Sequence, residues 1–469
     1  MKKIKNLIAD LLTLVMPQYA ILKHLIRWTV LILPIAIVIG SVVAFFLWLL
    51  TAAIHFRFNH EWLLFLLPLG GLLIHFVYQS AGKSSEKGND LIIEQIHQEG
   101  GEVPKRMAPI ILATTVITHL FGGSAGREGT AVQIGGSIAS LFGRWFNAKG
   151  PDMRMILTAG VAAGFGAVFG TPLAGTVFAM EVLTIGRIQY GALLPALIAA
   201  VVADVTVAAW QVDHIHYHID QLSKASYFIA DFFGRDLLLL GKIILASAAF
   251  GLVSFLFAKM VHEIKAVGLK LFKRQWMIPV VGGIIIILLT FLIGKPDYLS
   301  LGVDAEYRGA VTIPSAFLQG GSATWSWLWK TIYTALTLGT GFKGGEVTPL
   351  FYIGATLGNT LANILNAPIS LFAALGFVAV FAGATNTPLA STFMGIELFG
   401  GEHALLFGIA CFTAYFFSGH SGIYGAQRIE VPKIVDEYFA GETLSEAMNR
   451  RSDMLQKLRK YRLRFKNKE

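Results

Sequence analysis

Long apolar runs alternate with short polar or glycine-rich breaks along the chain. Four of the runs are long enough to cross a bilayer core of about 30 Å, which takes roughly 20 helical residues. They are Trp28–Leu50, Trp62–Gln79, Leu237–Phe257 and Trp276–Ile293. Other runs are shorter and interrupted by Gly or Pro, which is typical of helices that cross only part of a membrane. The pattern predicts an all-α polytopic membrane protein with many tilted and broken helices.

Apolar periodicity and helix-start signals place the other helices. We expect an amphipathic N-terminal helix before the first span, a helix over Glu61–Gln79 and a short helix after Gly88. The segment Asp213–Ala230 is a polar connection between two series of helices. Further helices are expected over Pro109–Phe121, Glu128–Phe146, Arg154–Val168, Pro172–Ile185, Leu193–Gln211, Arg235–Val267, Thr324–Leu338, Val347–Leu365, Ile369–Phe381, Pro388–Phe399 and His403–Phe417.

The two series are related by an internal repeat. A Thr-Pro-Leu-Ala segment followed by a glutamate occurs twice with identical spacing, at Thr171 to Glu181 and at Thr387 to Glu397. At nearly the same offset Glu128 matches Glu346. Two ordered matches make chance recurrence of small-residue patterns a poor explanation. We therefore expect a duplication whose halves are inverted in the membrane if each crosses it an odd number of times.

Composition and charge support this organisation. Of the 469 residues, 55% are hydrophobic and only 14% are charged, too few to cover a soluble globule. Basic residues flank the first span and crowd the end of the chain, where Leu444–Lys468 is expected to form an amphipathic surface helix. By the positive-inside bias both termini are expected in the cytoplasm. Topology and attraction to membrane lipid explain the net charge of +9, so no nucleic-acid binding is expected.

These features divide the chain into five parts. No small-residue cleavage site precedes the first span, so we expect no removable signal peptide. The expected parts are a cytoplasmic amphipathic segment at 1–26, a first membrane repeat at 27–215, a linker at 216–231, a second membrane repeat at 232–430 and a basic cytoplasmic tail at 431–469.

Each half contains a loop in which glycines and a carboxylate precede an apolar helix, at Gly126–Thr130 and Gly344–Pro349. The first turn of a helix exposes unpaired N–H groups and about half a positive charge, so it binds an anion without a permanent cation. Gly88–Asp90 offers a third such helix start. We expect a small inorganic anion where the three segments meet. The single Cys411 and the scattered histidines predict neither a disulfide nor a metal site, and no cofactor.

Glu128 is the most informative side chain in these loops. An ionised carboxylate competes with an anion for the same N–H groups, and its protonation would release them, which couples anion passage to a proton. Glu128 could instead cap its own helix or pair with Arg127, as glutamates near helix N-termini often do. The repeat and the flanking glycines favour the coupling role.

Over about residues 25–430 these motifs resemble those of the CLC anion channels and transporters. The resemblance rests on Gly126–Gly129, Gly344–Pro349 and Gly422–Tyr424, in that order. It implies an inverted two-half fold and a homodimer with a separate pore in each subunit. By the same resemblance Glu128 is the gating glutamate, and Asn89 and Tyr424 are side-chain ligands of the central anion. The backbone donors that it implies belong to Arg127, Gly129, Glu346 and Val347.

Several positions depart from the chloride pattern of this family, namely Gly88–Ile92, Thr130, Val182 and Val347. Val182 stands where chloride exchangers carry an internal proton-relay glutamate. The departures resemble the bacterial branch that exports fluoride in exchange for protons, in which the glutamate matching Glu346 is thought to assist proton movement. A small, strongly hydrated anion needs dense hydrogen-bond donors, which Asn89, Thr348 and Tyr424 could supply.

The sequence therefore predicts a secondary transporter, and not an enzyme, that exchanges fluoride for protons across a bacterial plasma membrane. A chloride channel or chloride/proton exchanger of the same family is the nearest alternative, and anion competition separates the two. A cation-coupled or amino-acid symporter also explains inverted repeats, but it predicts sodium dependence. A membrane-embedded enzyme would need a nucleophile and base at usable spacing, and none stands out.

Overall fold

The computed structural model describes residues 2–98, 101–212, 219, 235–433 and 441–450. The expected linker 216–231 lies almost entirely outside these ranges. In the tail, residues 444–450 are helical, which confirms the expected start of a helix at Leu444. The remainder of that helix, up to Lys468, lies outside the described residues.

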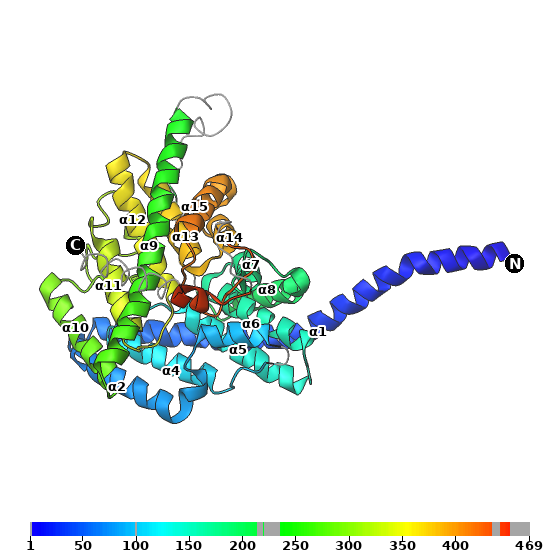
Figure 1. Ribbon diagram of the computed structural model, residues 1–469, viewed down its shortest axis with the longest axis horizontal. Coiled ribbons are helices and arrows are strands. Elements are labelled where there is room, and N and C mark those ends of the chain that lie inside the picture. The colour runs from blue at the N-terminus through cyan, green and yellow to red at the C-terminus, as the bar shows by residue number, and fades with distance from the viewer. Residues whose placement is uncertain (1, 99–100, 213–218, 220–234, 434–440, 451–469) are drawn as a thin grey trace, which may run out of the picture.

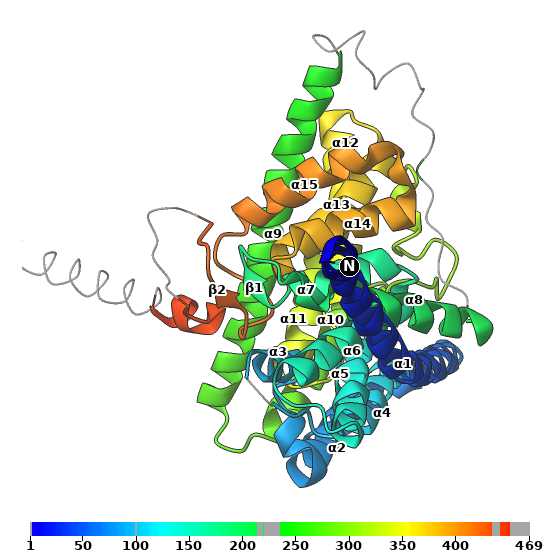
Figure 2. The ribbon, with the colours of Figure 1, turned by 90° about the vertical axis from the view of Figure 1, so that its right-hand side faces the viewer.

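Fifteen α-helices, several short 3₁₀ and π segments and one two-stranded sheet are found in the described part of the chain (Figure 1 and Figure 2). The helices of the first half are α1 (Lys2–Phe58), α2 (Leu67–Val77), α3 (Asn89–His97), α4 (Met107–Leu120), α5 (Glu128–Trp145), α6 (Pro151–Phe169), α7 (Pro172–Glu181) and α8 (Leu193–Ala209). Those of the second half are α9 (Arg235–Leu271), α10 (Met277–Ile293), α11 (Ser326–Gly339), α12 (Val347–Leu365), α13 (Ile369–Thr385), α14 (Pro388–Phe399) and α15 (Ala404–Phe417).

The first helix is longer than expected. α1 joins the predicted N-terminal helix and the first span into one helix of 57 residues, so the expected boundary at 26/27 falls inside it. Pro34 lies within α1 without ending it, which membrane-spanning helices tolerate. In Figure 1 the N-terminal part of α1 projects away from the body of the molecule.

Two other predicted helices are shorter in the structure. The helix expected to end at Ile185 ends at Glu181, because Thr184–Ile185 (β1) pairs in parallel with Arg428–Ile429 (β2), as Figure 2 shows. The span expected over Glu61–Gln79 begins as a 3₁₀ helix, Glu61–Leu66, before α2 starts. The apolar periodicity of Glu61–Gln79 does not distinguish a 3₁₀ helix from an α-helix. The periodicity around Thr184–Ile185 gives no sign of the partner strand β2, which lies far away in the sequence.

Small residues bring the central helices of each half close together. A Cβ atom on Gly135 of α5 would lie only 2.1 Å from the carbonyl oxygen of Gly160 in α6. In the second half, a Cβ atom on Gly354 of α12 would lie 2.0 Å from the carbonyl oxygen of Gly376 in α13. Glycine at these positions is therefore what permits close contact between the backbones, as in other membrane helix pairs.

The two halves meet through an antiparallel bridge between their glycine loops. The N–H of Gly126 donates to the carbonyl oxygen of Gly345 at 2.6 Å, and the N–H of Gly345 donates to that of Gly126 at 2.7 Å. We call this pair of hydrogen bonds the Gly126–Gly345 bridge. An antiparallel contact between equivalent segments is what two inverted copies produce, so the repeat seen in the sequence is an inverted repeat.

The second repeated motif makes a reciprocal contact between α7 and α14. The carboxylate of Glu181, at the end of α7, accepts hydrogen bonds from the N–H groups of Leu389 and Ala390 at 3.0 and 2.8 Å. The carboxylate of Glu397, in α14, accepts from Leu173 and Ala174 at 2.9 and 2.8 Å. Each glutamate thus caps the other half's helix at its N-terminus, where N–H groups lack partners within the helix. This explains why the Thr-Pro segments recur together with the glutamates.

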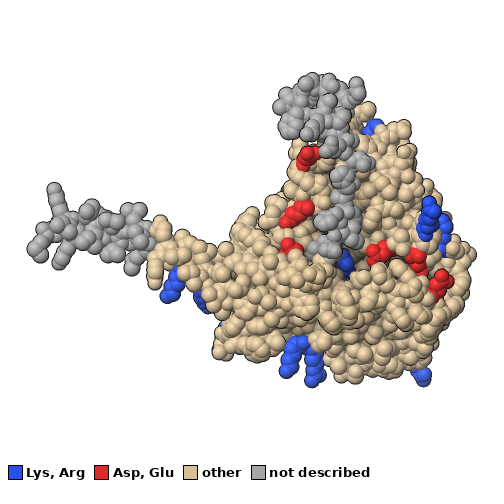
Figure 3. Space-filling model, turned by 180° about the vertical axis from the view of Figure 1, so that it is seen from behind, with Lys and Arg blue, Asp and Glu red and all other residues tan. Residues whose placement is uncertain are grey.

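The outer surface is suited to lipid. Within the described residues, five helical segments are long and apolar enough to cross a membrane by length and composition: Gln18–Phe58, Glu61–His97, Pro151–Phe169, Tyr190–Ala209 and Leu237–Leu271. Large apolar side chains such as Trp48, Leu245 and Leu292 are exposed on the long helices. Figure 3 shows charged side chains widely spaced over one face of the molecule. Uncharged side chains therefore take most of this face, as a hydrocarbon environment requires.

Candidate anion-binding site

Three helices begin at the junction of the two halves, each at a segment that the sequence singled out. α3 begins at Asn89, α5 at Glu128 and α12 at Val347. The Gly126–Gly345 bridge holds the starts of α5 and α12 against each other. Because helix N-termini carry unpaired N–H groups, this junction concentrates hydrogen-bond donors in the interior of the protein.

The Glu128 carboxylate fills the space between α5 and α12. The side chain is only 1% exposed. One of its oxygens accepts hydrogen bonds from the backbone N–H of Arg127 and of Thr348, both at 3.0 Å. The hydroxyl of Thr348 donates to the other oxygen. Since α12 belongs to the second half, Glu128 binds across the interface, and it also accepts the N–H of Arg127, the N-cap residue of its own helix.

Arg127 and Gly126 shape the immediate surroundings of this carboxylate. Arg127 Nε lies 3.8 Å from Glu128 Oε1, too far for a hydrogen bond but close enough for an ion pair. A Cβ atom on Gly126 would lie 2.7 Å from Glu128 Oε2, so only glycine leaves room for the carboxylate here. Glu128 therefore does form the alternative ion pair with the Arg127 side chain. The hydrogen bonds of Glu128 come instead from the Thr348 hydroxyl and from the backbone N–H groups of Arg127 and Thr348.

Asn89, Gly129 and Glu346 meet on a neighbouring side of the junction. The place where a Cβ atom of Gly129 would lie is 2.9 Å from Asn89 Nδ2 and 3.6 Å from Glu346 Oε2. Among the described residues, neither Asn89 Oδ1 nor Glu346 Oε2 has a hydrogen-bond partner, although both atoms are buried. Buried polar atoms are normally hydrogen-bonded, so unpaired ones mark a place where a proton or a polar ligand can enter.

Tyr424 and Asn89 share a small cavity beside this junction. Val182 and Phe178 also line it, and Phe178 meets the Tyr424 ring edge to face at 6.4 Å between centroids. Tyr424 is 4% exposed, and the segment that follows it is tied to α3 because Asp90 accepts a hydrogen bond from the Ala426 N–H at 3.1 Å. The apolar Val182 gives the cavity no titratable group at that position.

The eight residues proposed from the sequence thus gather around one junction. Glu128 and Thr348 are in direct contact, and Arg127, Gly129, Val347 and Glu346 belong to the two loops that the bridge joins. Asn89 comes from α3, and Tyr424 lies beyond it across the small cavity. The roles of these residues stay predictions, since the contacts alone assign none.

Sequence reasoning missed three buried polar residues near the site. Gln133, in α5, places its Nε2 atom 3.3 Å from where a Cβ atom of Gly88 would lie. His119, at the end of α4, is fully buried and reaches the carbonyl oxygen of Gly126. Ser300 contacts His119 across 181 positions of sequence. A polar residue within an apolar helix was the available signal for Gln133 and His119, but none existed for Ser300.

Buried donors directed at a carboxylate, between two inverted sets of membrane helices, define an integral membrane protein that carries ions. A family model described as voltage gated chloride channel matches residues 65–419. The chain therefore belongs to the CLC family of anion channels and transporters.

Individual relatives agree with this family. The chain is 44% identical over 414 residues to the chloride/fluoride channel protein of Pseudomonas syringae pv. tomato, covering 88% of both chains. It is 26% identical over 294 residues to the H(+)/Cl(-) exchange transporter ClcA of Vibrio cholerae, covering 60% of this chain and 59% of that one. A crystal structure of a CLC-type fluoride/proton antiporter superposes with a TM-score of 0.79 at 35% identity, covering 87% of this chain and 98% of the other. The expected all-α inverted-repeat fold is thereby confirmed.

Proposed function

We propose that this protein exchanges fluoride for protons across the membrane. The observation that carries the proposal is the position of the Glu128 carboxylate. It takes up the N–H and hydroxyl of Thr348, at the start of α12, together with the N–H of Arg127. These are the donors that an anion would need, and a halide and an ionised Glu128 cannot both have them.

Protonation of Glu128 would change this competition. A neutral carboxyl group loses most of its attraction to the helix N-terminus, so an anion can take its place on the same donors. When the anion leaves, Glu128 can return only by giving up its proton. Alternation between the two states links the passage of an anion in one direction to that of a proton in the other.

Glu346 extends this proposal, because its buried Oε2 atom has no hydrogen-bond partner among the described residues. It lies in the α12 loop that the bridge joins to the Glu128 loop. A second carboxylate so close to the first can hold a proton on its way to or from Glu128. Val182 offers no such group, so a route through that position is not part of the proposal.

Fluoride is favoured over chloride by the donor set and by the relatives. Asn89, Thr348 and Tyr424 add side-chain donors to the backbone N–H groups, which suits a small anion that gives up a strong hydration shell. The Pseudomonas relative is named for both chloride and fluoride, and the similar solved antiporter for fluoride. The Vibrio relative is named for chloride, which keeps a chloride channel or chloride/proton exchanger as the second candidate.

The setting that we propose is a homodimer in the plasma membrane of a bacterium, with both termini in the cytoplasm. Each subunit would carry its own pathway. The basic residues at the two ends of the chain support this orientation. Enzymatic turnover and nucleic-acid binding form no part of the proposal.

Flux measurements in proteoliposomes test it. Vesicles are loaded with fluoride or chloride, and external halide and pH are recorded together after an electrical shunt is added. We expect fluoride efflux with proton uptake and much slower chloride efflux. Chloride efflux at the fluoride rate would favour the second candidate, and fluoride efflux without proton movement would contradict exchange. Replacing sodium by potassium should change neither flux, which separates the protein from a sodium-coupled symporter.

A further inference from the structure

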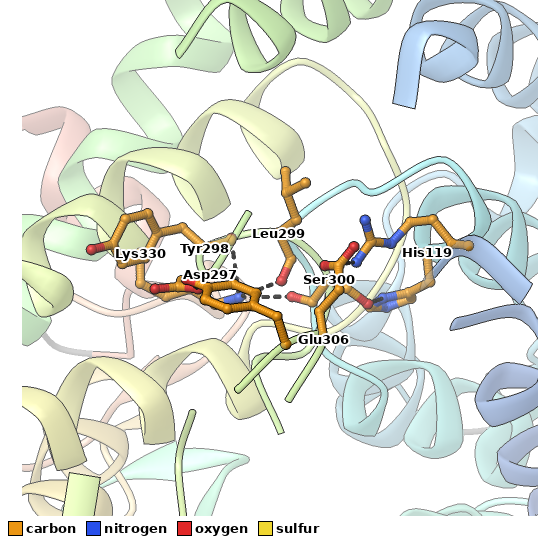
Figure 4. A network of polar contacts seen from close by, with 9 residues as sticks. His119, Asp297, Tyr298, Leu299, Ser300, Glu306 and Lys330 are labelled. Carbon is orange, nitrogen blue, oxygen red and sulfur yellow. Dashed lines mark hydrogen bonds and ion pairs between the residues drawn. The ribbon is translucent and has the colours of Figure 1, made fainter. Parts of the chain in front are cut away.

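A fully buried lysine lies in α11, outside the loops discussed so far. The Lys330 side chain is 0% exposed. Its ammonium donates to the carbonyl oxygens of Tyr298, Leu299 and Ser300 at 3.2, 3.4 and 2.7 Å, as Figure 4 shows. Placing an ammonium in a dry interior is costly unless its hydrogen bonds are satisfied. Lys330 therefore holds these three consecutive carbonyl groups firmly in place.

Ser300 adopts a backbone conformation that few residues take without support. Its φ is +48°, in the left-handed region, which costs a non-glycine residue conformational energy. The hydrogen bond from Lys330 to its carbonyl oxygen keeps this conformation in place. In that position the Ser300 hydroxyl lies 3.0 Å from Nδ1 of His119.

His119 connects Ser300 to the candidate anion-binding site. Its Nε2 lies 3.5 Å from the carbonyl oxygen of Gly126, the same oxygen that accepts the Gly345 N–H in the bridge. A carbonyl oxygen only accepts, so Nε2 must carry a hydrogen to bond it. In the neutral ring Nδ1 then accepts, and the Ser300 hydroxyl donates to it.

The peptide bond between Gly126 and Arg127 connects this contact to the site. In a trans peptide the C=O and N–H groups share a plane and point in opposite directions. No cis peptide occurs in the described part of the chain. The carbonyl oxygen of this peptide faces His119 and Gly345, and its N–H faces the Glu128 carboxylate at 3.0 Å. Fixing the oxygen on one side therefore fixes the direction of the donor on the other.

We propose that His119, supported by Ser300 and Lys330, is a positioning residue that points the Arg127 N–H at the anion. We call the three residues the peptide-orienting relay. The inference rests on the proposed function, because it takes the Arg127 N–H as a donor to the transported halide. To the proposed function this inference adds a chain of hydrogen bonds from Lys330 through Ser300 and His119 to the Gly126 carbonyl, which fixes the direction of the Arg127 N–H.

The expected consequence is a loss of halide affinity. A hydrogen bond contributes about 0.5–1.5 kcal/mol net, so misdirecting one donor should weaken halide binding roughly two- to tenfold. Proton coupling should be retained, because Glu128 loses only the Arg127 N–H and keeps both hydrogen bonds from Thr348. A residue that only supports the fold would lower stability without this selective effect.

Four variants separate the links of the relay. Ser300→Ala removes only the hydroxyl and leaves the carbonyl oxygen that Lys330 binds. His119→Leu removes the ring nitrogens, whereas His119→Gln keeps an N–H donor near the position of Nε2. Lys330→Met removes the ammonium. The control is Asn359→Leu, because Asn359 is equally buried and donates to the loop carbonyls of Ala316 and Leu318 without a contact to the bridge.

Fluoride and chloride affinities are measured by titration calorimetry on the purified full-length protein, with proton-to-halide stoichiometry and melting temperature recorded for each variant. We expect weaker halide binding in Ser300→Ala, His119→Leu and Lys330→Met, with unchanged stoichiometry and recovery in His119→Gln. The double variant of His119→Leu with Lys330→Met should bind halide as tightly as the single variant with the lower affinity, because both substitutions act through the same contact. The control should lose thermal stability only.

Unchanged affinity in Ser300→Ala and His119→Leu would overturn the relay, whatever their melting temperatures. So would equal losses in His119→Gln and His119→Leu. Halide binding by the wild-type protein tests the proposed function separately. If the wild type binds and exchanges halide while the variants match it, only the relay fails.

Discussion

Glu128 is held by the groups that it would surrender to the anion in the proposed exchange. Its carboxylate takes two backbone N–H groups and one hydroxyl, and its side chain is almost fully enclosed. In the proposed exchange this residue would compete with the anion for the same donors. Its attraction to them would depend on one proton, as a coupling group requires.

Replacing Glu128 by glutamine should separate anion passage from proton movement. The amide stays neutral, and its NH₂ group faces N–H donors that it cannot satisfy, so it should leave the site to the anion. We expect halide flux to persist while pH-driven fluoride uptake disappears, measured in proteoliposomes with halide and pH electrodes. The control is Glu102→Gln, at an exposed ion pair with Arg144. Retained pH-driven uptake in Glu128→Gln would contradict the coupling role.

Thr348 offers a finer test, because its N–H and its hydroxyl both donate to Glu128. Thr348→Val removes the hydroxyl and keeps the N–H and the shape. We expect halide affinity to fall about two- to tenfold, the range for one lost hydrogen bond, with proton coupling retained. Thr356→Val is the matched control, since that buried hydroxyl bonds only carbonyl oxygens of its own helix. Equal affinity in the two variants would exclude Thr348 as an anion ligand.

The site residues that could be predicted from the sequence all lie in a recognisable local sequence pattern. Glu128, Val347 and Thr348 stand at the start of an apolar helix after glycines, a sequence signal with a physical meaning. Ser300 and Lys330 have no such signal, because their contacts span 30 or more positions and depend on loop paths. His119 was marked only as a polar residue within an apolar helix, although its contact with Gly126 spans just 7 positions. Asp90 was visible as part of a helix start, but its bond to Ala426 spans 336 positions.

At the scale of elements, helix starts were predicted better than helix ends. α5 and α12 begin at Glu128 and Val347 as expected, since glycine, proline and first-turn acids mark a helix start. α7 ends four residues before its predicted end, where β1 pairs with β2 from the far end of the chain. A helix end that is set by a partner distant in the sequence cannot be predicted from the apolar periodicity of the helix itself.

The reciprocal glutamate caps should matter for stability more than other ion contacts. Glu181→Ala leaves the N–H groups of Leu389 and Ala390 without acceptors, and Glu397→Ala does the same for α7. We expect each to lower the free energy of unfolding by about 1–3 kcal/mol, measured by denaturant titration in detergent micelles. The comparison is Glu430→Ala, which removes an exposed ion pair with Arg187 and should cost about 0–1 kcal/mol. Equal losses of unfolding free energy in the three variants would show that the caps stabilise the protein no more than an exposed ion pair does.

At the scale of the whole molecule, the halves hold each other through contacts near their inverted-repeat axis. The Gly126–Gly345 bridge and the two glutamate caps all join one half to the other. The expected linker 216–231 connects the halves along the chain and is distant in sequence from all three contacts. Folding of the assembly should therefore depend on these contacts more than on chain continuity.

A split protein tests this. Residues 1–223 and 224–469, co-expressed as separate chains, should copurify and reconstitute proton-coupled fluoride flux. Expression of either part alone should give no flux, because each part lacks either Glu128 or Thr348. Introducing Glu181→Ala and Glu397→Ala together should reduce recovery of the split assembly more than that of the intact chain. Failure of the two parts to copurify would show that the linker is needed to bring the halves together.

The reciprocal caps also bear on how such a molecule could arise. A contact in which each partner offers the same glutamate and the same helix start is isologous, the kind that two identical subunits form about a two-fold axis. One ancestral half with a single Thr-Pro segment and its glutamate could have satisfied both ends by meeting an oppositely inserted copy of itself. Gene fusion would then have joined a pair already complementary, and only afterwards could the two loops diverge into one that carries Glu128 and one whose Thr348 binds it.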